Sequence, residues 1–183
     1  MIIGKKIIYY DQIDSTNDES KRLIKTGLLE GTVIIAKTQS QGRGKPGSSW
    51  FSAGGLGIYL SVIVKPFKNP NDLGSITLIG ARAVVATIDK VAGLKAEIKV
   101  PNDVLLNGKK ICGILVERVA SGEVVIGIGL NVNQQQNNFP QELKEKATSL
   151  KIVTGQDYDL TKVIEILLLD LEVEYLAYLN KLC

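Results

Sequence analysis

Residues 97–117 read EIKVPNDVLLNGKKICGILVE, and this stretch indicates which kind of sheet the chain builds. Short apolar runs at 104–106 and 111–116 flank the dipeptide Asn107-Gly108. Asn-Gly between two such runs is a strong hairpin signal, because both residues tolerate the positive φ angles of a two-residue turn. The stretch therefore predicts adjacent antiparallel strands with no helix between them.

On either side of this hairpin lie short β-branched runs and longer helical runs, of which 73–91 is apolar nearly all round and 159–182 is amphipathic. We expect strands at 7–10, 32–36, 58–64, 97–100 and 123–130, and helices from Ser15 or Thr16 to near Gly27, at 73–91 and at 159–182. The glycine-rich residues 42–57 are expected to form a loop. Because strands outnumber helices and several are hairpin-linked, the prediction is an α+β fold, a mixed, mostly antiparallel sheet packed by helices on one face. A single domain over residues 1–183 is expected from the length.

The composition excludes several kinds of catalytic site. The chain contains no histidine, which removes Ser-His-Asp and Cys-His nucleophiles, His-ligated zinc and imidazole bases. Two cysteines, Cys112 and Cys183, are too few for a disulfide framework or a four-cysteine zinc site. The net charge of +3 does not by itself indicate nucleic-acid binding. An enzyme with this sequence would have to use Lys, Arg, Asp, Asn and backbone amides.

Two further features concern the cellular compartment. The residues after Met1 become polar within a few positions, unlike a secretory signal. The apolar run 163–173 is interrupted by Glu165, Asp170 and Glu172, so it is far from a membrane span. We therefore expect a reduced, cytoplasmic protein with no membrane partner.

Residues 39–50, QSQGRGKPGSSW, are the first candidate for chemistry. Glycines let the backbone approach a ligand closely, and Arg43 and Lys45 add charge suited to a phosphate or carboxylate. The stretch is neither a Walker loop nor a dinucleotide fingerprint, since no Gly-Lys-Ser/Thr follows and a strand rather than a helix comes next. On glycine spacing alone, a solvated surface loop is the favoured interpretation.

Three more stretches are candidates. In Lys99-Val100-Pro101-Asn102-Asp103, an amide beside a carboxylate suits Mg²⁺, although Pro-Asn-Asp is also a good turn. Lys110 enters an apolar strand in which Gly113 permits close approach, although charges at a hairpin flank are common. Residues 127–133, GIGLNVN, place glycines inside a strand and Asn131 at its end, which equally fits a bulge or tight packing. Each signal is weak when taken singly.

Together, and in this order, the motifs resemble those of biotin protein ligases. They are Asp14-Ser15-Thr16-Asn17, then Gln-x-x-Gly-Arg-Gly-Lys-x-Gly-x-x-Trp from Gln39, Lys-x-Pro-Asn-Asp from Lys99, Lys-x-x-Gly-Ile-Leu-x-Glu from Lys110, and Gly-x-Gly-x-Asn-x-Asn from Gly127. The resemblance spans residues 14–133. It implies the catalytic-domain fold shared by class II synthetases and the biotin and lipoate ligases.

The resemblance also implies a reaction in two steps. The biotin carboxylate attacks the α-phosphate of MgATP to give biotinyl-5′-AMP and pyrophosphate, and a lysine of a biotin carboxyl carrier protein then displaces AMP. Bringing two anions together requires cancellation of charge at the α-phosphate, which Arg, Lys and Mg²⁺ can supply without histidine. ATP and Mg²⁺ are thus the expected cofactors and biotin the substrate.

Site residues are carried over by position in the motifs. The resemblance implies catalytic roles for Arg43, Asp103 and Lys110, and magnesium binding by Asn102 and Asp103. The implied biotin-binding residues are Ser15, Thr16, Asn17, Gln39, Arg43, Gly44, Lys45, Lys110 and Gly113. The implied nucleotide-binding residues are Arg43, Lys45, Lys99, Asn102 and Asn131. Trp50 is expected to pack beneath the loop rather than react.

The chain departs from the family pattern at three points. Lys45 replaces the usual second arginine of the loop, and Val100 replaces the usual tryptophan before Pro-Asn-Asp. We expect no small C-terminal β-barrel domain, and no N-terminal helix-turn-helix and hence no DNA partner. A homodimer formed through sheet edges is expected by analogy with many relatives.

Two other functions remain to be weighed. A lipoate or octanoate transferase would require Arg-Arg-x-x-Gly-Gly-Gly and a histidine motif, and this chain has neither. A non-catalytic protein that binds biotin or biotinyl-AMP is the alternative that the departures at Lys45 and Val100 keep open. Retention of Lys99, Asn102, Asp103 and Lys110 argues against it, since a biotin binder has no need of groups on the magnesium side.

Overall fold

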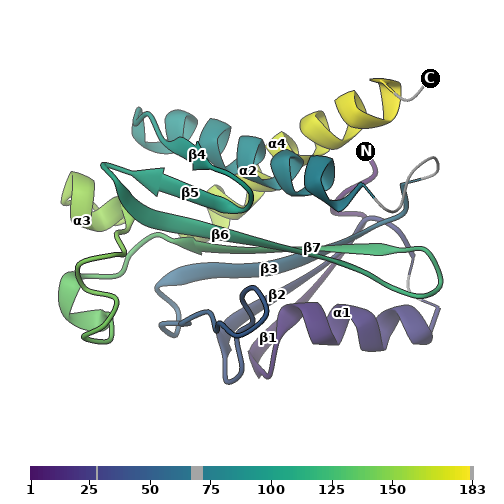
Figure 1. The fold of residues 1–183 in the computed structure, drawn as a ribbon, viewed down its shortest axis with the longest axis horizontal. Helices are drawn as coiled ribbons and strands as arrows, with labels where there is room; N and C mark the ends of the chain where they lie inside the picture. The colour runs from purple at the N-terminus through teal and green to yellow at the C-terminus, as the bar shows by residue number, and fades with distance from the viewer. Residues whose placement is uncertain (28, 67–71, 182–183) are drawn as a thin grey trace.

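The computed structural model describes residues 1–27, 29–66 and 72–181 and contains one seven-stranded sheet with helices on both of its faces (Figure 1). The strands are β1 (Lys6–Ile13), β2 (Thr32–Gln39), β3 (Gly57–Val64), β4 (Glu97–Lys99), β5 (Asp103–Leu106), β6 (Lys109–Arg118) and β7 (Val124–Asn131). The helical elements are α1 (Thr16–Lys25), α2 (Leu73–Ala92), the 3₁₀ turn η1 (Gln136–Asn138), α3 (Leu150–Thr154) and α4 (Leu160–Lys181). The expected end of the last helix, at Leu182, lies outside the described residues, and so do Leu28 and Cys183.

The sheet is mixed and mostly antiparallel, as predicted. Its strand order is β1-β2-β3-β7-β6-β5-β4. Within the described residues, β1 pairs with β2 in parallel and every other neighbouring pair is antiparallel. Strand β7 lies between β3 and β6, so that Gly57 pairs with Asn131 although the two are far apart in sequence. This insertion brings the first and second halves of the chain together at the centre of the sheet.

The turn at residues 107–108 confirms the hairpin prediction. Asn107 has φ 52° and Gly108 has φ 75°, the two positive values that a type I′ turn requires. The turn joins β5 to β6 and places Asp103 and Lys110 on neighbouring strands. A local dipeptide signal therefore sets the relation between two candidate site residues.

The placement of the helices differs from the prediction. Helices α2 and α4 pack on one face of the sheet, but α1 lies on the other, against β2, β3 and β7 (Figure 1). The prediction of helices on one face was wrong because the amphipathicity of α1 does not reveal which face it covers. Strand β3, GIYLSVIV, is buried along its whole length because helices cover both of its sides.

Helix α1 begins at a cap and leads directly into the candidate site. Ser15 is the N-cap, and its side chain accepts a hydrogen bond from the Asp18 N–H at 3.4 Å. Asp18 and Glu19 occupy the first turn, where negative charge is favoured. Asn17 and Ser20 face inward and are buried. The cap thus fixes the direction in which the first turn presents its polar side chains to the sheet.

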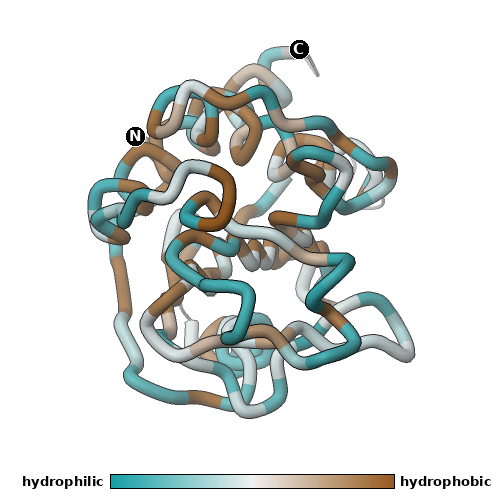
Figure 2. The backbone as a smooth tube through the Cα atoms, turned by 90° about the vertical axis from the view of Figure 1, so that its left-hand side faces the viewer, coloured by the Kyte–Doolittle hydropathy of each residue, from teal (hydrophilic) through white to brown (hydrophobic). Residues whose placement is uncertain are grey.

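Apolar residues concentrate between the sheet and the pair α2 and α4. Brown, hydrophobic stretches of the tube follow the strands and helices, whereas the loops are largely teal (Figure 2). The largest fully buried side chains of this core include Ile58, Leu60, Ile76 and Tyr175. In the part of the chain that the structure describes, no helix combines the length and apolarity needed to cross a membrane.

Candidate functional site

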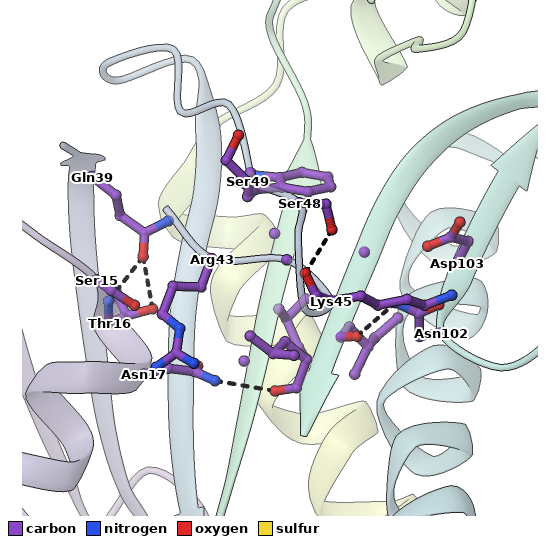
Figure 3. Close-up of a pocket in the computed structure, with 18 of the residues that line it drawn as sticks. Ser15, Thr16, Asn17, Gln39, Arg43, Lys45, Ser48, Ser49, Asn102 and Asp103 are labelled. Carbon is purple, nitrogen blue, oxygen red and sulfur yellow. Dashed lines mark hydrogen bonds between the residues drawn. The ribbon is translucent and has the colours of Figure 1, made fainter. Parts of the chain in front are cut away.

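A cavity of about 280 Å³ lies on the α1 side of the sheet, where α1, the 42–50 loop and the central strands meet (Figure 3). It brings together most of the residues singled out from the sequence: Ser15, Thr16, Asn17, Gln39, Arg43, Gly44, Lys45, Asn102, Asp103, Lys110 and Gly113. These residues come from α1 and its N-cap, β2, the loop, β5 with the turn before it, and β6. Motifs separated by up to a hundred positions thus line one space.

Asn17 forms the floor of the cavity, and its amide is fixed from both ends. The Ser61 hydroxyl donates to Asn17 Oδ1 at 2.6 Å. The Nδ2 group donates to Glu117 Oε2 at 2.8 Å and to the Leu115 carbonyl at 3.2 Å. Because donors and acceptors are assigned at both ends, the amide has one orientation. Ser61 was missed in the sequence, although a lone serine inside the apolar run of β3 was the available signal.

Thr16 and Gln39 form the adjoining wall. Gln39 Oε1 accepts from the Thr16 N–H at 2.8 Å and from the Thr16 hydroxyl at 3.1 Å. The Gln39 Nε2 group donates to Ser52 at 3.2 Å. This pairing joins the end of β2 to the start of α1 and leaves a polar wall beside Asn17, with donors and acceptors for a compact polar ligand.

Glycines in β6 and β7 make room for the floor and for Trp50. A Cβ atom on Gly127 would lie 2.1 Å from Asn17 Oδ1, and one on Gly129 would lie 2.4 Å from Trp50 Cε2. A Cβ on Gly113 would lie 2.8 Å from Trp50 Cζ3. The indole therefore lies flat over two strands at positions where only glycine fits, in agreement with the expectation that Trp50 packs beneath the loop.

Lys110 lies between an acid and an aromatic ring. Its Nζ is 2.7 Å from Asp103 Oδ1 and 5.5 Å from the centroid of the Trp50 ring. The Lys110 N–H donates to the Lys146 carbonyl at 2.8 Å, and its carbonyl accepts from the Thr148 N–H at 2.9 Å. Main chain on one side and side chains on the other thus hold this ammonium at the edge of the cavity.

Arg43 crosses the mouth of the cavity and pairs with two carboxylates. Its Nη2 is 2.9 Å from Glu117 Oε1, and its Nη1 donates to Asp18. Burial lowers the pKa of Arg43, but the hydrogen bond to Asp18 and the charges of Glu117 and Asp18 outweigh that effect and raise the pKa above its usual value. The pairing with Asp18 and Glu117 is a second feature that the sequence did not indicate.

Two of the expected residues do not line this cavity. Lys99 is exposed on β4, the strand at the outer edge of the sheet. Asn131 is buried, with Nδ2 donating to the Thr148 carbonyl at 2.9 Å and Oδ1 accepting from Gln134 at 3.2 Å. Asn131 thus lines a different cavity and not the one that contains Asn17.

A second, smaller cavity adjoins the first. It has a volume of about 90 Å³ and is mostly aromatic and apolar, with Phe51 and Phe139 at 6.3 Å between ring centroids. Its lining residues are Ser49, Trp50, Phe51, Lys110, Asn131, Phe139, Leu143 and Ala147. Ser49, Trp50 and Lys110 line both cavities, so a ligand that fills both would pass Lys110.

Asn102 and Asp103 offer oxygen atoms to a cation. The Asn102 Nδ2 group donates to the Ile114 carbonyl at 3.2 Å, and the buried Oδ1 has no hydrogen-bond partner among the described residues. No cluster of three or more Asp, Glu, His or Cys residues suited to a metal occurs in the described part of the chain. The pair therefore fits Mg²⁺ carried largely by phosphates, which needs only one or two protein oxygens.

Comparison with known proteins identifies the family. The model of the biotin/lipoate A/B protein ligase family matches residues 9–133. The chain belongs to this family. The ligase motifs noted in the sequence all begin within the matched range, and the mixed sheet with its helices is the catalytic-domain fold of biotin and lipoate ligases.

Three similar proteins define the relationship more closely. The chain is 41% identical to the bifunctional ligase/repressor BirA of Bacillus subtilis over 98% of its own length and 56% of that protein's length. It is 36% identical to the biotin–[acetyl-CoA-carboxylase] ligase of Mycobacterium tuberculosis, covering 92% of this chain and 64% of that protein. The solved biotin protein ligase of Aquifex aeolicus in complex with biotin and ATP superposes with TM-score 0.87 at 30% identity, covering 97% of this chain and 73% of that one. The chain thus spans just over half the length of the Bacillus relative.

Proposed function

We propose that this chain is a biotin–protein ligase, which activates biotin with MgATP to biotinyl-5′-AMP and transfers the biotin to a lysine of a biotin carboxyl carrier protein. The observation that carries the proposal is the position of Lys110, whose ammonium lies where a polar cavity meets an aromatic one. The names of the similar proteins, and the biotin and ATP bound to the Aquifex ligase, point to the same chemistry.

In the first step the polar cavity would hold the ring system of biotin. Asn17, Thr16 and Ser15 offer groups to its ureido end, Gln39 and Gly113 line the wall, and the carboxylate extends toward Lys110. The small cavity, with Trp50, Phe51 and Phe139, suits an adenine base, and Asn131 lies at its border. This arrangement would bring the carboxylate to the α-phosphorus at Lys110.

The bond that forms joins a biotin carboxylate oxygen to the α-phosphorus, and the bond that breaks joins the α-phosphorus to the bridging oxygen of pyrophosphate. Lys110, Arg43 and Lys45 would neutralise the charge that develops at this phosphate, and Gly44 lets the loop approach it closely. Magnesium, when bound through Asn102 and Asp103, would neutralise the leaving pyrophosphate. Lys99, at the outer strand, would act on the nucleotide only at longer range.

In the second step the ε-amine of the carrier lysine attacks the acyl carbon and AMP leaves. The amine must lose a proton, and Asp103 is the carboxylate closest to Lys110 in the cavity, at 2.7 Å. We assign Asp103 as the acceptor of that proton. Exclusion of water by the Arg43 loop would protect the adenylate from hydrolysis before the carrier arrives.

The proposal extends to partners and compartment. Strand β1 is an edge strand of the sheet and exposes Ile7 and Tyr9, which suits pairing with a second copy of the chain. We propose a homodimer that acts in the cytoplasm on a carrier domain.

The test is biotin-dependent release of pyrophosphate from MgATP, with lipoate as the control acid. We expect pyrophosphate release with biotin but not with lipoate, and no release once a chelator is added. Lys110→Met should reduce the rate by about 100-fold, because it removes a preorganised charge at the phosphate. Lys109→Met is the matched control, since Lys109 pairs with Glu145 at 3.6 Å and lines neither cavity, and it should leave the rate unchanged.

Two results would overturn the proposal. Biotin binding seen by thermal shift, without pyrophosphate release, would make this chain a biotin-binding protein. Release with lipoate but not with biotin would assign it to the lipoate branch of the family.

A further inference from the structure

Four charged side chains form a cluster that includes Arg43, a residue that lines the larger cavity. Asp18 and Lys21 come from α1, Glu117 from β6 and Arg43 from the loop. Glu117 Oε1 is 2.9 Å from Arg43 Nη2 and 2.8 Å from Lys21 Nζ, while Lys21 Nζ is also 3.3 Å from Asp18 Oδ1. The loop arginine is therefore held by one carboxylate from a helix and one from a strand.

Arg43 is the tie between the loop and the rest of the protein. Within the loop, the Gly44 N–H donates to the Ser48 carbonyl at 3.1 Å and the Ser48 N–H donates to the Lys45 carbonyl at 2.8 Å. For the residues that the structure describes, the hydrogen bonds and ion pairs of 44–49 stay within this loop, whereas the guanidinium of Arg43 reaches outside it. Breaking the Arg43 pairs would thus free residues 44–49, while Trp50 stays packed on the sheet.

Glu117 also contacts the floor of the cavity. Its second oxygen, Oε2, accepts from Asn17 Nδ2 at 2.8 Å. The Glu117 side chain is 19% exposed and that of Arg43 is 40% exposed, so the carboxylate is the more sheltered and more fixed partner. One side chain of β6 therefore orients the floor amide with one oxygen and holds the loop with the other.

We propose that Glu117, assisted by Asp18, is a latch that holds the Arg43 loop closed and thereby sets the rate at which a bound ligand leaves. Glu117 acts through Arg43 and Asn17, so it is a positioning residue. The identity of the ligand as biotin rests on the proposed function, whereas the latch itself is a contact between protein groups.

The first test needs no ligand. Trypsin cuts after Arg43 when the loop is open, while the Lys45-Pro46 bond resists it, so the rate of appearance of fragment 1–43 reports loop opening. Glu117→Gln keeps the shape of the side chain and an oxygen for Asn17 but removes the charge that Arg43 pairs with. We expect cleavage about threefold to tenfold faster, the range for loss of a charge-assisted, partly exposed pair.

Controls for this test come from charge and salt. Glu123→Gln removes a glutamate whose pair with Lys65, at 3.1 Å, lies outside the cavity, and it should leave the cleavage rate unchanged. Asp18→Asn should also raise the cleavage rate, because it removes the other carboxylate that pairs with Arg43. Raising the salt concentration to about 0.5 M should accelerate cleavage of the parent, and should accelerate cleavage of Glu117→Gln by a smaller factor, because only the Arg43–Asp18 pair then remains to be screened.

The second test measures dissociation of labelled biotin chased with unlabelled biotin. Glu117→Gln should increase the dissociation rate about threefold to tenfold in the parent. In an Arg43→Gln background it should have no further effect, because the two residues act as one unit. An equal effect in both backgrounds would overturn the latch, since Glu117 would then act through Asn17 alone.

The outcomes separate the latch from the proposed function. Faster cleavage in Glu117→Gln, in a protein that neither binds biotin nor releases pyrophosphate, would support the latch and refute the function. Normal pyrophosphate release together with unchanged cleavage and unchanged biotin dissociation in Glu117→Gln would refute the latch and leave the function standing.

Discussion

Gly127 illustrates how much of this site depends on an absent side chain. The space where its Cβ would stand is occupied by Asn17 Oδ1, at 2.1 Å. We expect Gly127→Ala to displace Asn17, to lower the free energy of unfolding by about 1–3 kcal/mol through overpacking, and to raise the biotin Kd by about tenfold or more. Urea unfolding and calorimetric titration with biotin would measure the two effects.

Gly54→Ala is the matched control for that substitution. Its nearest neighbour would be Thr38 Cβ at 3.8 Å, an ordinary contact, so biotin affinity should not change. A Gly127→Ala protein that binds biotin as tightly as the parent would show that Asn17 does not need its present position.

Asp14 carries a pH-dependent contribution to stability. The hydrogen bond from Arg22 lowers the pKa of Asp14 to about 2, and the Ser15 N–H assists, while burial opposes them. Because the folded pKa lies below the ordinary 3.8, the stabilisation is complete above about pH 5 and is lost as the pH falls toward 2. This carboxylate thus stabilises the turn into α1 at neutral pH.

We expect Asp14→Asn to lower the free energy of unfolding by about 0.5–1 kcal/mol at pH 7, a modest value because both partners are partly exposed. Thermal unfolding of parent and variant from pH 7 to pH 2 measures it, and the gap should close between about pH 4 and pH 2. A gap that stays constant down to pH 2 would mean that the Arg22 pair does not stabilise the fold.

At the scale of elements, the segment 146–148 fixes the backbone of Lys110. The Lys146 carbonyl and the Thr148 N–H bracket the Lys110 backbone, and Asn131 Nδ2 holds the Thr148 carbonyl at 2.9 Å. Gln134, fully buried, orients Asn131 and accepts from the Val132 N–H at 2.7 Å. Asn131 therefore contributes to the site through the segment that it holds.

We expect Asn131→Ala to lower the free energy of unfolding by about 1–3 kcal/mol, because it leaves the Thr148 carbonyl buried without its donor. Urea unfolding in the absence of ligand provides the measurement. Unchanged unfolding together with a loss of ATP affinity would instead show that Asn131 acts by direct contact with the nucleotide.

At the scale of the whole molecule, α2 and α4 form a layer on the face of the sheet away from the larger cavity. Leu171 is fully buried in this layer, whereas Leu169 on the same helix is 56% exposed. Leu171→Ala should lower the free energy of unfolding by about 2–5 kcal/mol, and Leu169→Ala by less than about 0.5 kcal/mol. Both folded proteins should bind biotin as the parent does, which titration well below the unfolding temperature would check.

How far the sequence predicts this molecule depends on how local each signal is. Asn107-Gly108 predicts its hairpin because two neighbouring residues determine the turn. Strand β2 runs to Gln39, beyond the expected Ala36, because pairing with β1 extends it through polar residues that have no apolar pattern. The face covered by α1 could not be predicted, because it depends on contacts between distant segments.

The same distinction applies to the site. Motif order identified most of the residues that line the larger cavity, since each motif is continuous in the chain. The contact of Glu117 with Asn17 and Arg43 joins three separate motifs, and no local pattern reports such a meeting. Ser61 was missed because its hydrogen bond to Asn17 depends on α1 packing against β3.

The pairing of β3 with β7 has a consequence for how the chain folds. Strands β1 to β3 with α1 form one set of near neighbours in sequence, and β4 to β7 form an antiparallel meander, so each set closes short loops. Joining Gly57 to Asn131 closes a long one, and such contacts are expected to form late. Because Asn17 belongs to the first set and Gly127 to the second, the cavity exists only after the two have docked. A ligand that binds between the two sets of strands stabilises the docked state relative to the undocked one. The stabilisation free energy rises with the logarithm of the ligand concentration once this exceeds the Kd.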